Sequence, residues 1–137
     1  MRTFLVSLFI ASITGVLTFT AFPTAWFPEV SLFWLIWLSH VPLMWLLRTK
    51  GPRASFWWGW CTGSIINTGG YYWIAHMLGT FGGFPTALAM AGSLIHGIYL
   101  GLMWGIWALL LNRVTNTTSV GIEWGAPVCM VTVELLF

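Results

Sequence analysis

Charged side chains are the scarcest feature of this chain, which has five Lys and Arg residues and three acidic residues among 137. They make up 6% of the sequence, whereas about a quarter of the residues in a soluble domain are charged. Hydrophobic residues make up 58%, and the mean hydropathy is +0.87. The scarcity of charge excludes an ordinary soluble domain and predicts an integral membrane protein. The net charge of +2, with no basic patch interleaved with aromatic side chains, excludes a nucleic-acid partner.

Cysteine is also scarce, because Cys61 and Cys129 are the only two and both stand within apolar runs. Two cysteines in that setting argue against a disulfide framework or a zinc site, and we interpret both as small buried apolar residues. The sequence has no HExxH, CxxC or GxSxG motif and no glycine-rich phosphate-binding loop. We therefore expect no metal site and no cofactor.

Long uncharged runs make up most of the chain. A hydrocarbon core about 30 Å thick takes about 20 helical residues to cross. The runs therefore predict an all-α integral membrane bundle of about five transmembrane helices. They form a single domain over 1–137, with spans at about residues 3–22, 30–47, 54–78, 86–111 and 120–137. The last run is still apolar at the final residue, so we expect a truncated C-terminus.

Two of these runs have a second interpretation. The first could be a cleaved signal peptide, although its apolar part is longer than usual and no small-residue cleavage site follows it. The second contains His40 and Pro42 and could be a broken or re-entrant helix, because proline removes an intrahelical hydrogen bond.

The basic residues test this division of the chain. With five spans and a cytoplasmic N-terminus, every basic residue falls on the cytoplasmic side and Glu29 falls outside; the basic residues are Arg2, Arg48, Lys50, Arg53 and Arg113. This distribution agrees with the positive-inside rule. The connection between the third and fourth spans is then on the outer face.

That outer connection interrupts the uncharged run from 54 to 112. Gly82, Gly83 and Pro85 predict the reversal, because glycine tolerates positive φ and proline fixes φ. Side chains typical of a membrane boundary surround it: Tyr71, Tyr72, Trp73, His76, Phe81 and Phe84. We therefore expect the segment 69–85 to lie at a membrane interface.

Small residues recur every four positions in the third and fourth spans. The two sets are Ser55, Gly59, Gly63 and Asn67, and Ser93, Gly97, Gly101 and Gly105. Such faces let two helix backbones approach closely within lipid. The pattern predicts that these two helices pack against each other as a hairpin.

A few polar residues fall within the expected spans, where they are functional candidates. Asn67, His96 and Glu134 are the most deeply placed, and His40 and His76 are nearer the boundary. Each histidine by itself is more simply interpreted as a hydrogen-bonded packing residue. Glu134 is the best single candidate, because a carboxylate at that depth needs a partner or an aqueous cavity.

Several of these elements together resemble bacterial apolipoprotein N-acyltransferase. The pair Tyr72-Trp73 and the Phe-Gly-Gly-Phe-Pro sequence at 81–85 are similar to the outer turn between the third and fourth membrane helices of that family. A first helix that ends at Phe22-Pro23, the pair Ala126-Pro127 and the sequence around Glu134 also match. The resemblance covers nearly the whole chain but only the N-terminal membrane part of a typical member.

The resemblance implies a multi-pass protein of the bacterial inner membrane that works in lipoprotein maturation. The family transfers an acyl chain from a phospholipid to the N-terminal cysteine of a lipoprotein, and its Glu, Lys and Cys catalytic residues belong to a nitrilase-like outer domain. Here the only lysine, Lys50, is on the cytoplasmic side and both cysteines are in spans, so we expect no catalytic residue in this chain.

We accordingly interpret the chain as a non-catalytic fragment or split-gene product, inactive in acyl transfer by itself. Its expected partners are a phospholipid acyl donor and a lipoprotein or a separate nitrilase-like domain. The candidates for lipid or substrate binding are Tyr72, Trp73, Phe81, Gly82, Gly83 and Glu134.

Two other functions stay open. A small transporter or channel subunit would line a polar path with Asn67, His96 and Glu134, although the internal repeat common in transporters is not seen. A structural membrane scaffold would bind partners through the glycine faces.

Overall fold

The computed structural model describes residues 2–22 and 32–136, which form helices and no strands. The elements are α1 (Arg2–Thr20), the 3₁₀ turn η1 (Phe33–Leu35), α2 (Ile36–Ser39), α3 (Val41–Arg48), α4 (Pro52–Gly70), α5 (Trp73–Thr80), α6 (Thr86–Thr117) and α7 (Ile122–Glu134). The predicted all-α class is confirmed for these residues. Glu29, which we expect on the outer side, lies outside the described residues.

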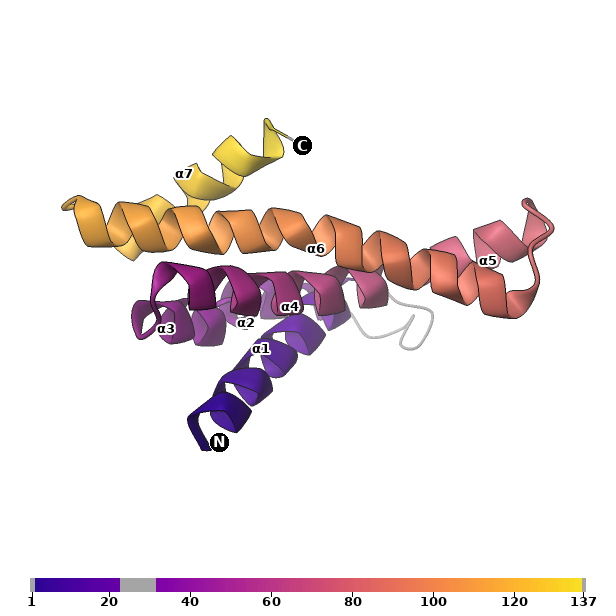
Figure 1. Ribbon diagram of the computed structural model, residues 1–137, viewed down its shortest axis with the longest axis horizontal. Coiled ribbons are helices and arrows are strands. Elements are labelled where there is room, and N and C mark those ends of the chain that lie inside the picture. Colours follow the sequence, from indigo (N-terminus) through magenta and orange to yellow (C-terminus); the bar gives the residue numbers. More distant parts are fainter. Residues whose placement is uncertain (1, 23–31, 137) are drawn as a thin grey trace.

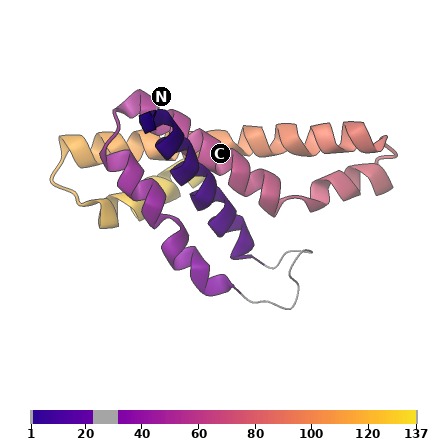
Figure 2. The ribbon, with the colours of Figure 1, turned by 90° about the horizontal axis from the view of Figure 1, so that it is seen from below.

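Helix α6 is the axis of the molecule (Figure 1). Its 32 residues are about 48 Å long at 1.5 Å per residue, which is more than the thickness of a hydrocarbon core. Helix α4 runs antiparallel along its middle, α5 folds back on its N-terminal part and α7 packs near its C-terminal part (Figures 1 and 2). Helix α1 packs against α4, and α2 and α3 pack chiefly against α1, with α3 also reaching α4 and α6.

The contact between α4 and α6 is made by the two predicted small-residue faces, whose eight members are all buried. The backbones come so close that a Cβ added at Gly59 would lie 2.5 Å from the Cβ of Ala108 and 2.6 Å from the carbonyl oxygen of Trp104. A Cβ at Gly101 would likewise overlap Ser64. The predicted packing of these two helices is confirmed.

Polar side chains tie the other helices to this pair. The Asn112 side-chain amide donates to the carbonyl oxygens of Leu47 (3.3 Å) and Lys50 (2.8 Å) where α3 ends, and the Leu47 oxygen also accepts from the Lys50 N–H (3.2 Å). The Trp107 indole N–H donates to the carbonyl oxygen of Ala126, 2.9 Å away in α7. These bonds join α6 to its neighbours at the end of the bundle that carries the basic residues.

The residues expected as the second span form a broken helix. Helix α2 ends at Ser39 and α3 begins at Val41, with Pro42 in the first turn of α3. Because Pro42 has no N–H, the helical hydrogen bond that would cross this point is missing. The broken-helix alternative is therefore the correct one for the described part of this segment.

The other helices also differ in extent from the expected spans. The residues expected as one helix at 54–78 form two, because α4 ends at Gly70 and α5 begins at Trp73. Helix α6 continues beyond 111 to Thr117, with side-chain hydroxyls bonded back to its own carbonyls. Helix α7 is shorter than 120–137, since it ends at Glu134.

The two ends of the bundle differ. The α3–α4 and α6–α7 connections lie at one end, with the start of α1 nearer to it, and the α4–α5 and α5–α6 connections lie toward the other (Figures 1 and 2). We call them the basic end and the hairpin end. Two helices, α1 and α6, are long and apolar enough to cross a membrane by length and composition, and Phe33–Arg48 is a shorter apolar segment.

Candidate functional site

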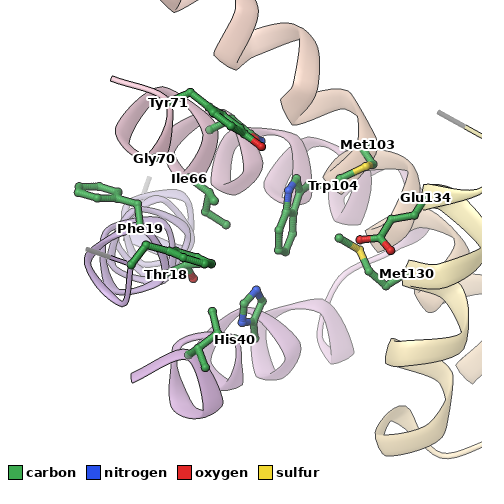
Figure 3. Close-up of a pocket in the computed structure, with 13 residues that line it drawn as sticks. Thr18, Phe19, His40, Ile66, Gly70, Tyr71, Met103, Trp104, Met130 and Glu134 are labelled. Carbon is green, nitrogen blue, oxygen red and sulfur yellow. The ribbon is translucent and has the colours of Figure 1, made fainter. Parts of the chain in front are cut away.

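A cavity of about 430 Å³ lies where α1, α2, α4, α6 and α7 meet (Figure 3). Its size is that of a small-molecule site, since such pockets span about 300 to 1,000 Å³. The walls are mostly apolar and aromatic, with the rings of Phe19, Phe22, Tyr71 and Trp104 among them. Five polar residues also line it: Thr18, His40, Asn67, Tyr71 and Glu134.

Helix ends surround this cavity. Helix α1 contributes Thr18 and Phe19 from its last turn, α4 contributes Asn67 and Gly70, and α7 contributes Met130 and Glu134. None of the three helices has a basic residue in its last turn. Carbonyl groups at helix C-termini carry partial negative charge, so the cavity has three sources of negative potential besides the Glu134 carboxyl group.

The wall opposite α4 is formed by His40, which sits at the break between α2 and α3. Its ring stacks on Trp104, with ring centroids 5.2 Å apart and an interplanar angle of 14°. The Ser39 hydroxyl donates to the carbonyl oxygen of Ile36 (3.1 Å) and lies 3.0 Å from Nδ1 of His40. In the tautomer with Nδ1 protonated, Nδ1–H donates to the Ser39 oxygen and Nε2 is a hydrogen-bond acceptor.

Asn67 is the most buried of the polar lining residues, at 7% exposure. Its side-chain amide donates to the carbonyl oxygen of Gly63 at 2.7 Å. The carboxamide oxygen has no protein partner among the described residues and remains an acceptor.

Glu134, the best sequence candidate, is the acidic group of the cavity (Figure 3). It is exposed and forms no ion pair with any residue in the described ranges. The carboxyl group thus borders a cavity and has no cationic partner within that part of the chain.

The other sequence candidates lie at the hairpin end instead. Trp73 begins α5 and Phe81 follows it, and they are 48% and 84% exposed. Gly82 and Gly83 form the reversal into α6, where Gly83 has φ of 66° and confirms the predicted glycine turn. The structure therefore separates Glu134 from the hairpin candidates, which include Tyr72.

Tyr71 connects the two places. It lines the cavity, and its ring also makes edge contacts with Trp73 (6.2 Å between centroids) and His96 (5.8 Å). His96 itself does not line the cavity. The polar path expected for a transporter, with Asn67, His96 and Glu134 together, is thus incomplete.

Sequence reasoning missed several members of the cavity wall. Trp104 gave no signal of its own, because it is one of 11 tryptophans in the chain. Phe19 was unremarkable in an apolar run, while His40 and Asn67 were identified as embedded polar residues. The described residues hold no group of three or more His, Cys, Asp or Glu side chains that could bind a metal ion.

A second hollow lies beside the cavity. This apolar groove of about 370 Å³ runs between α1, α4 and α6, and Phe19, Ile65, Leu94 and Ile98 are its large lining residues. Phe19 belongs to both hollows, and its ring packs against Gly69, where an added Cβ would lie 2.5 Å from the ring. The Phe19 side chain therefore lies between the cavity and the apolar groove.

Comparison with known proteins gives one consistent result. The family model described as "Apolipoprotein N-acyltransferase N-terminal domain" matches residues 14–137. "Apolipoprotein N-acyltransferase 2" of Leptospira interrogans is 29% identical over 125 residues, which cover 90% of this chain and 20% of the relative. "Apolipoprotein N-acyltransferase" of Geobacter metallireducens is 31% identical over 103 residues, covering 75% of this chain and 19% of the relative.

This chain thus spans about a fifth of the length of these curated relatives. No solved structure matches it.

Proposed function

Because the chain belongs to the apolipoprotein N-acyltransferase N-terminal domain family, we propose that it is the membrane portion of an enzyme for phospholipid-to-lipoprotein acyl transfer. The relatives' names and the match over residues 14–137 support this function. The phospholipid acyl donor would bind to this chain, and a nitrilase-like domain, joined or separate, would supply the chemistry.

The proposal places five segments across the bacterial inner membrane: α1, the broken segment from η1 to α3, α4 with α5, α6 and α7. Its support is the separation of charge. Arg48, Lys50 and Arg53 lie at or beside the α3–α4 connection, and Arg113 lies in the last turns of α6, toward the same basic end. The hairpin end would then face outward, in agreement with the positive-inside rule.

The observation that carries the functional proposal is the exposed aromatic surface at the hairpin end, which is formed by α5 and the turn into α6 and is called the hairpin below. Helix α5 has no buried residue, and Trp73, Phe81 and Phe84 are 48%, 84% and 45% exposed. Aromatic rings at headgroup depth pack against the glycerol region and the upper acyl chain of a lipid. The hairpin would hold an acyl donor at the mouth of the bundle, and holding reactants in place is a large part of such catalysis.

This chain would contribute binding and not the nucleophile. Cys61 lies in α4 and is half-buried, Cys129 lies in α7 and is buried, and Lys50 is at the basic end. Nucleophilic catalysis needs an activating base within hydrogen-bond reach, and these three residues lie on separate elements. The isolated chain should therefore be inactive in acyl transfer.

The test is a lipopeptide acylation assay on the isolated chain and on the chain joined to the outer domain of a relative. We expect no acylation from the isolated chain and acylation from the joined protein. Changing both Trp73 and Phe81 to alanine should lower the joined protein's rate at least about tenfold, which corresponds to about 1.4 kcal/mol of lost binding or positioning.

The matched control changes Trp45 and Trp124 to alanine, since both are exposed, at 61% and 72%, but lie on α3 and α7. This pair should keep the parental rate at equal expression. Acylation by the isolated chain would contradict the assignment of chemistry to another domain. A Trp73 and Phe81 double variant as active as the control pair would contradict the role of the hairpin.

A further inference from the structure

The basic end carries four of the five Lys and Arg residues of the chain. Arg48 ends α3, Lys50 lies in the connection that follows, Arg53 is in the first turn of α4, and Arg113 is near the end of α6. We call these four residues the basic cluster. The three arginines are exposed and Lys50 is half-buried, and none of the four forms an ion pair with another residue in the described ranges. Their charge is therefore available to a partner outside that part of the chain.

A buried side chain holds the members of the basic cluster together. Asn112 is 3% exposed, and its amide donates to the carbonyl oxygens of Leu47 and Lys50 at the end of α3. Arg48 follows Leu47 directly in the chain, as Arg113 follows Asn112. These hydrogen bonds fix the end of α6 against the α3–α4 connection, so the backbone of Arg113 lies beside that of Arg48 and Lys50. The cluster is thus formed by the fold itself, before any ligand binds.

Little negative charge is present to balance the basic cluster. Glu134 lines the cavity between the helices, and Glu123, in the first turn of α7, is the one acidic group at the basic end within the described residues. The Glu123 carboxylate lies against Gly121, the N-cap residue of its own helix, where the partial positive charge of a helix N-terminus stabilises it. The basic end therefore keeps an excess of positive charge, which favours an anionic ligand.

Exposed tryptophans next to the basic cluster indicate that the anion belongs to a lipid. Trp45 precedes Arg48 by three residues in α3, and Trp57 follows Arg53 by four residues in α4. Residues at these spacings share one face of a helix, so each arginine has an indole ring one turn farther into the bundle. The two rings are 61% and 56% exposed. Indole rings at a membrane boundary lie at headgroup depth, whereas a free phosphate ion would make no use of them.

We propose that the basic cluster binds the headgroup of an anionic phospholipid in the cytoplasmic leaflet. The phosphate lies at Arg48 and Arg53, because guanidinium groups bind phosphate oxygens through paired hydrogen bonds, and the upper acyl chains lie against the two indole rings. Each basic residue near an anionic membrane surface strengthens the attraction about fivefold. The inference rests on the membrane placement proposed above and not on acyl transfer. The site is at the opposite end of the bundle from the hairpin.

The experiment measures which lipids stay bound to the purified 137-residue chain in detergent, without an acylation step. The chain is mixed with equal amounts of phosphatidylglycerol and phosphatidylcholine of identical acyl chains, and the bound lipids are measured by native mass spectrometry. The wild-type chain should retain the anionic lipid at least about tenfold over the zwitterionic lipid. Arg48→Gln and Arg53→Gln remove one charge each and keep a polar side chain, and each should lower this ratio about three- to fivefold.

Arg2→Gln is the matched control. It removes the same charge from an exposed position at the start of α1, which lies apart from the α3–α4 connection (Figure 1). This variant should keep the ratio of the wild-type chain. Soluble glycerophosphoglycerol carries the same phosphate without acyl chains, and it distinguishes a lipid site from a site for free phosphate esters. At a concentration equal to that of the lipid, it should displace almost none.

Four outcomes would overturn the inference. Two are equal retention of the two lipids by the wild-type chain and an unchanged ratio in both Arg48→Gln and Arg53→Gln. The third is an equal loss in Arg2→Gln, which would mean that net charge alone attracts the lipid. The fourth is displacement of the lipid by the equimolar soluble phosphate ester. None of these bears on the acylation assay, so a failure here is separate from a failure of the proposed function.

Discussion

The two parts of α6 have different environments. From Gly97 to Asn112 the helix is held against α4 by buried glycines, and the buried side chains of Trp107 and Asn112 bond it to α7 and to the end of α3. From Thr86 to Ile95 it is covered on one side by α5, and Leu88, Met90 and Ile95 are 53%, 62% and 67% exposed. The first part is a close-packed scaffold, while the second presents side chains to its surroundings. The proposed lipid-binding surface of the hairpin thus lies where packing is weakest, as expected for loops and helix ends that carry function.

The largest effect should come from overpacking the scaffold. Gly101→Leu places a side chain where even a Cβ would overlap the backbone of Ser64, and backbone cannot move aside as a flexible side chain can. Overpacking a tight core costs about 1 to 3 kcal/mol and occasionally more, and we expect about 3 kcal/mol or loss of folding. Thermal unfolding in detergent measures this loss.

The control for that change is Gly79→Leu in α5, where the nearest atom to an added Cβ is 4.0 Å away. Leucine has a better helix propensity than glycine, so this variant should unfold at or slightly above the wild-type temperature. Equal losses at Gly101 and Gly79 would mean that the scaffold and the hairpin are packed alike.

A smaller effect is expected from removing a buried hydrogen bond of the scaffold. Asn112→Ala deletes the bonds to the carbonyl oxygens of Leu47 and Lys50; Leu47 keeps the Lys50 N–H, but the Lys50 oxygen loses this donor, and a buried group left without a partner costs about 1 to 3 kcal/mol. The unfolding midpoint in detergent should fall accordingly. Thr80→Ala, which deletes an exposed 3.4 Å contact with His76 in the hairpin, should change it by less than about 0.5 kcal/mol. A larger loss of stability from Thr80→Ala than from Asn112→Ala would contradict the view that the scaffold is more tightly held than the hairpin.

The smallest effect belongs to the hairpin turn. Gly83→Ala introduces a side chain at φ of 66°, where an added Cβ meets no other atom but the left-handed conformation itself costs about 1 kcal/mol. We expect a fall of that size in thermal unfolding and a gain of up to about 1 kcal/mol for Gly79→Ala four residues earlier. An unchanged unfolding temperature in Gly83→Ala would show that the turn does not need glycine, contrary to the positive φ at this position.

Features that depend on neighbouring residues could be predicted from the sequence. The small-residue faces of α4 and α6 could be identified because side chains four positions apart share one face of any helix. The reversal at Gly83 and the break near Pro42 follow from the backbone preferences of glycine and proline. The membrane class follows from composition, which does not depend on how the helices are arranged.

The cavity could not be predicted in this way, because its lining comes from five helices. His40, Asn67, Trp104 and Glu134 are far apart in the sequence and share no spacing that marks them as a group. Their meeting depends on where each helix ends and which face it turns inward. The break between α4 and α5 at Tyr71 and Tyr72 could not be predicted either. Hydropathy alone predicted one continuous helix there, because it does not register where a helix ends.

The amino-acid sequence by itself thus determined the membrane class, the glycine contact of α4 with α6 and the turn at Gly83, because each is a property of composition or of residues within one or two helical turns. Only the tertiary structure decided that Glu134 lies in a cavity with His40 and Trp104 and apart from Trp73 and Phe81. The physical reason is that helix crossing and helix termination depend on the sum of many distant contacts, which no local pattern contains.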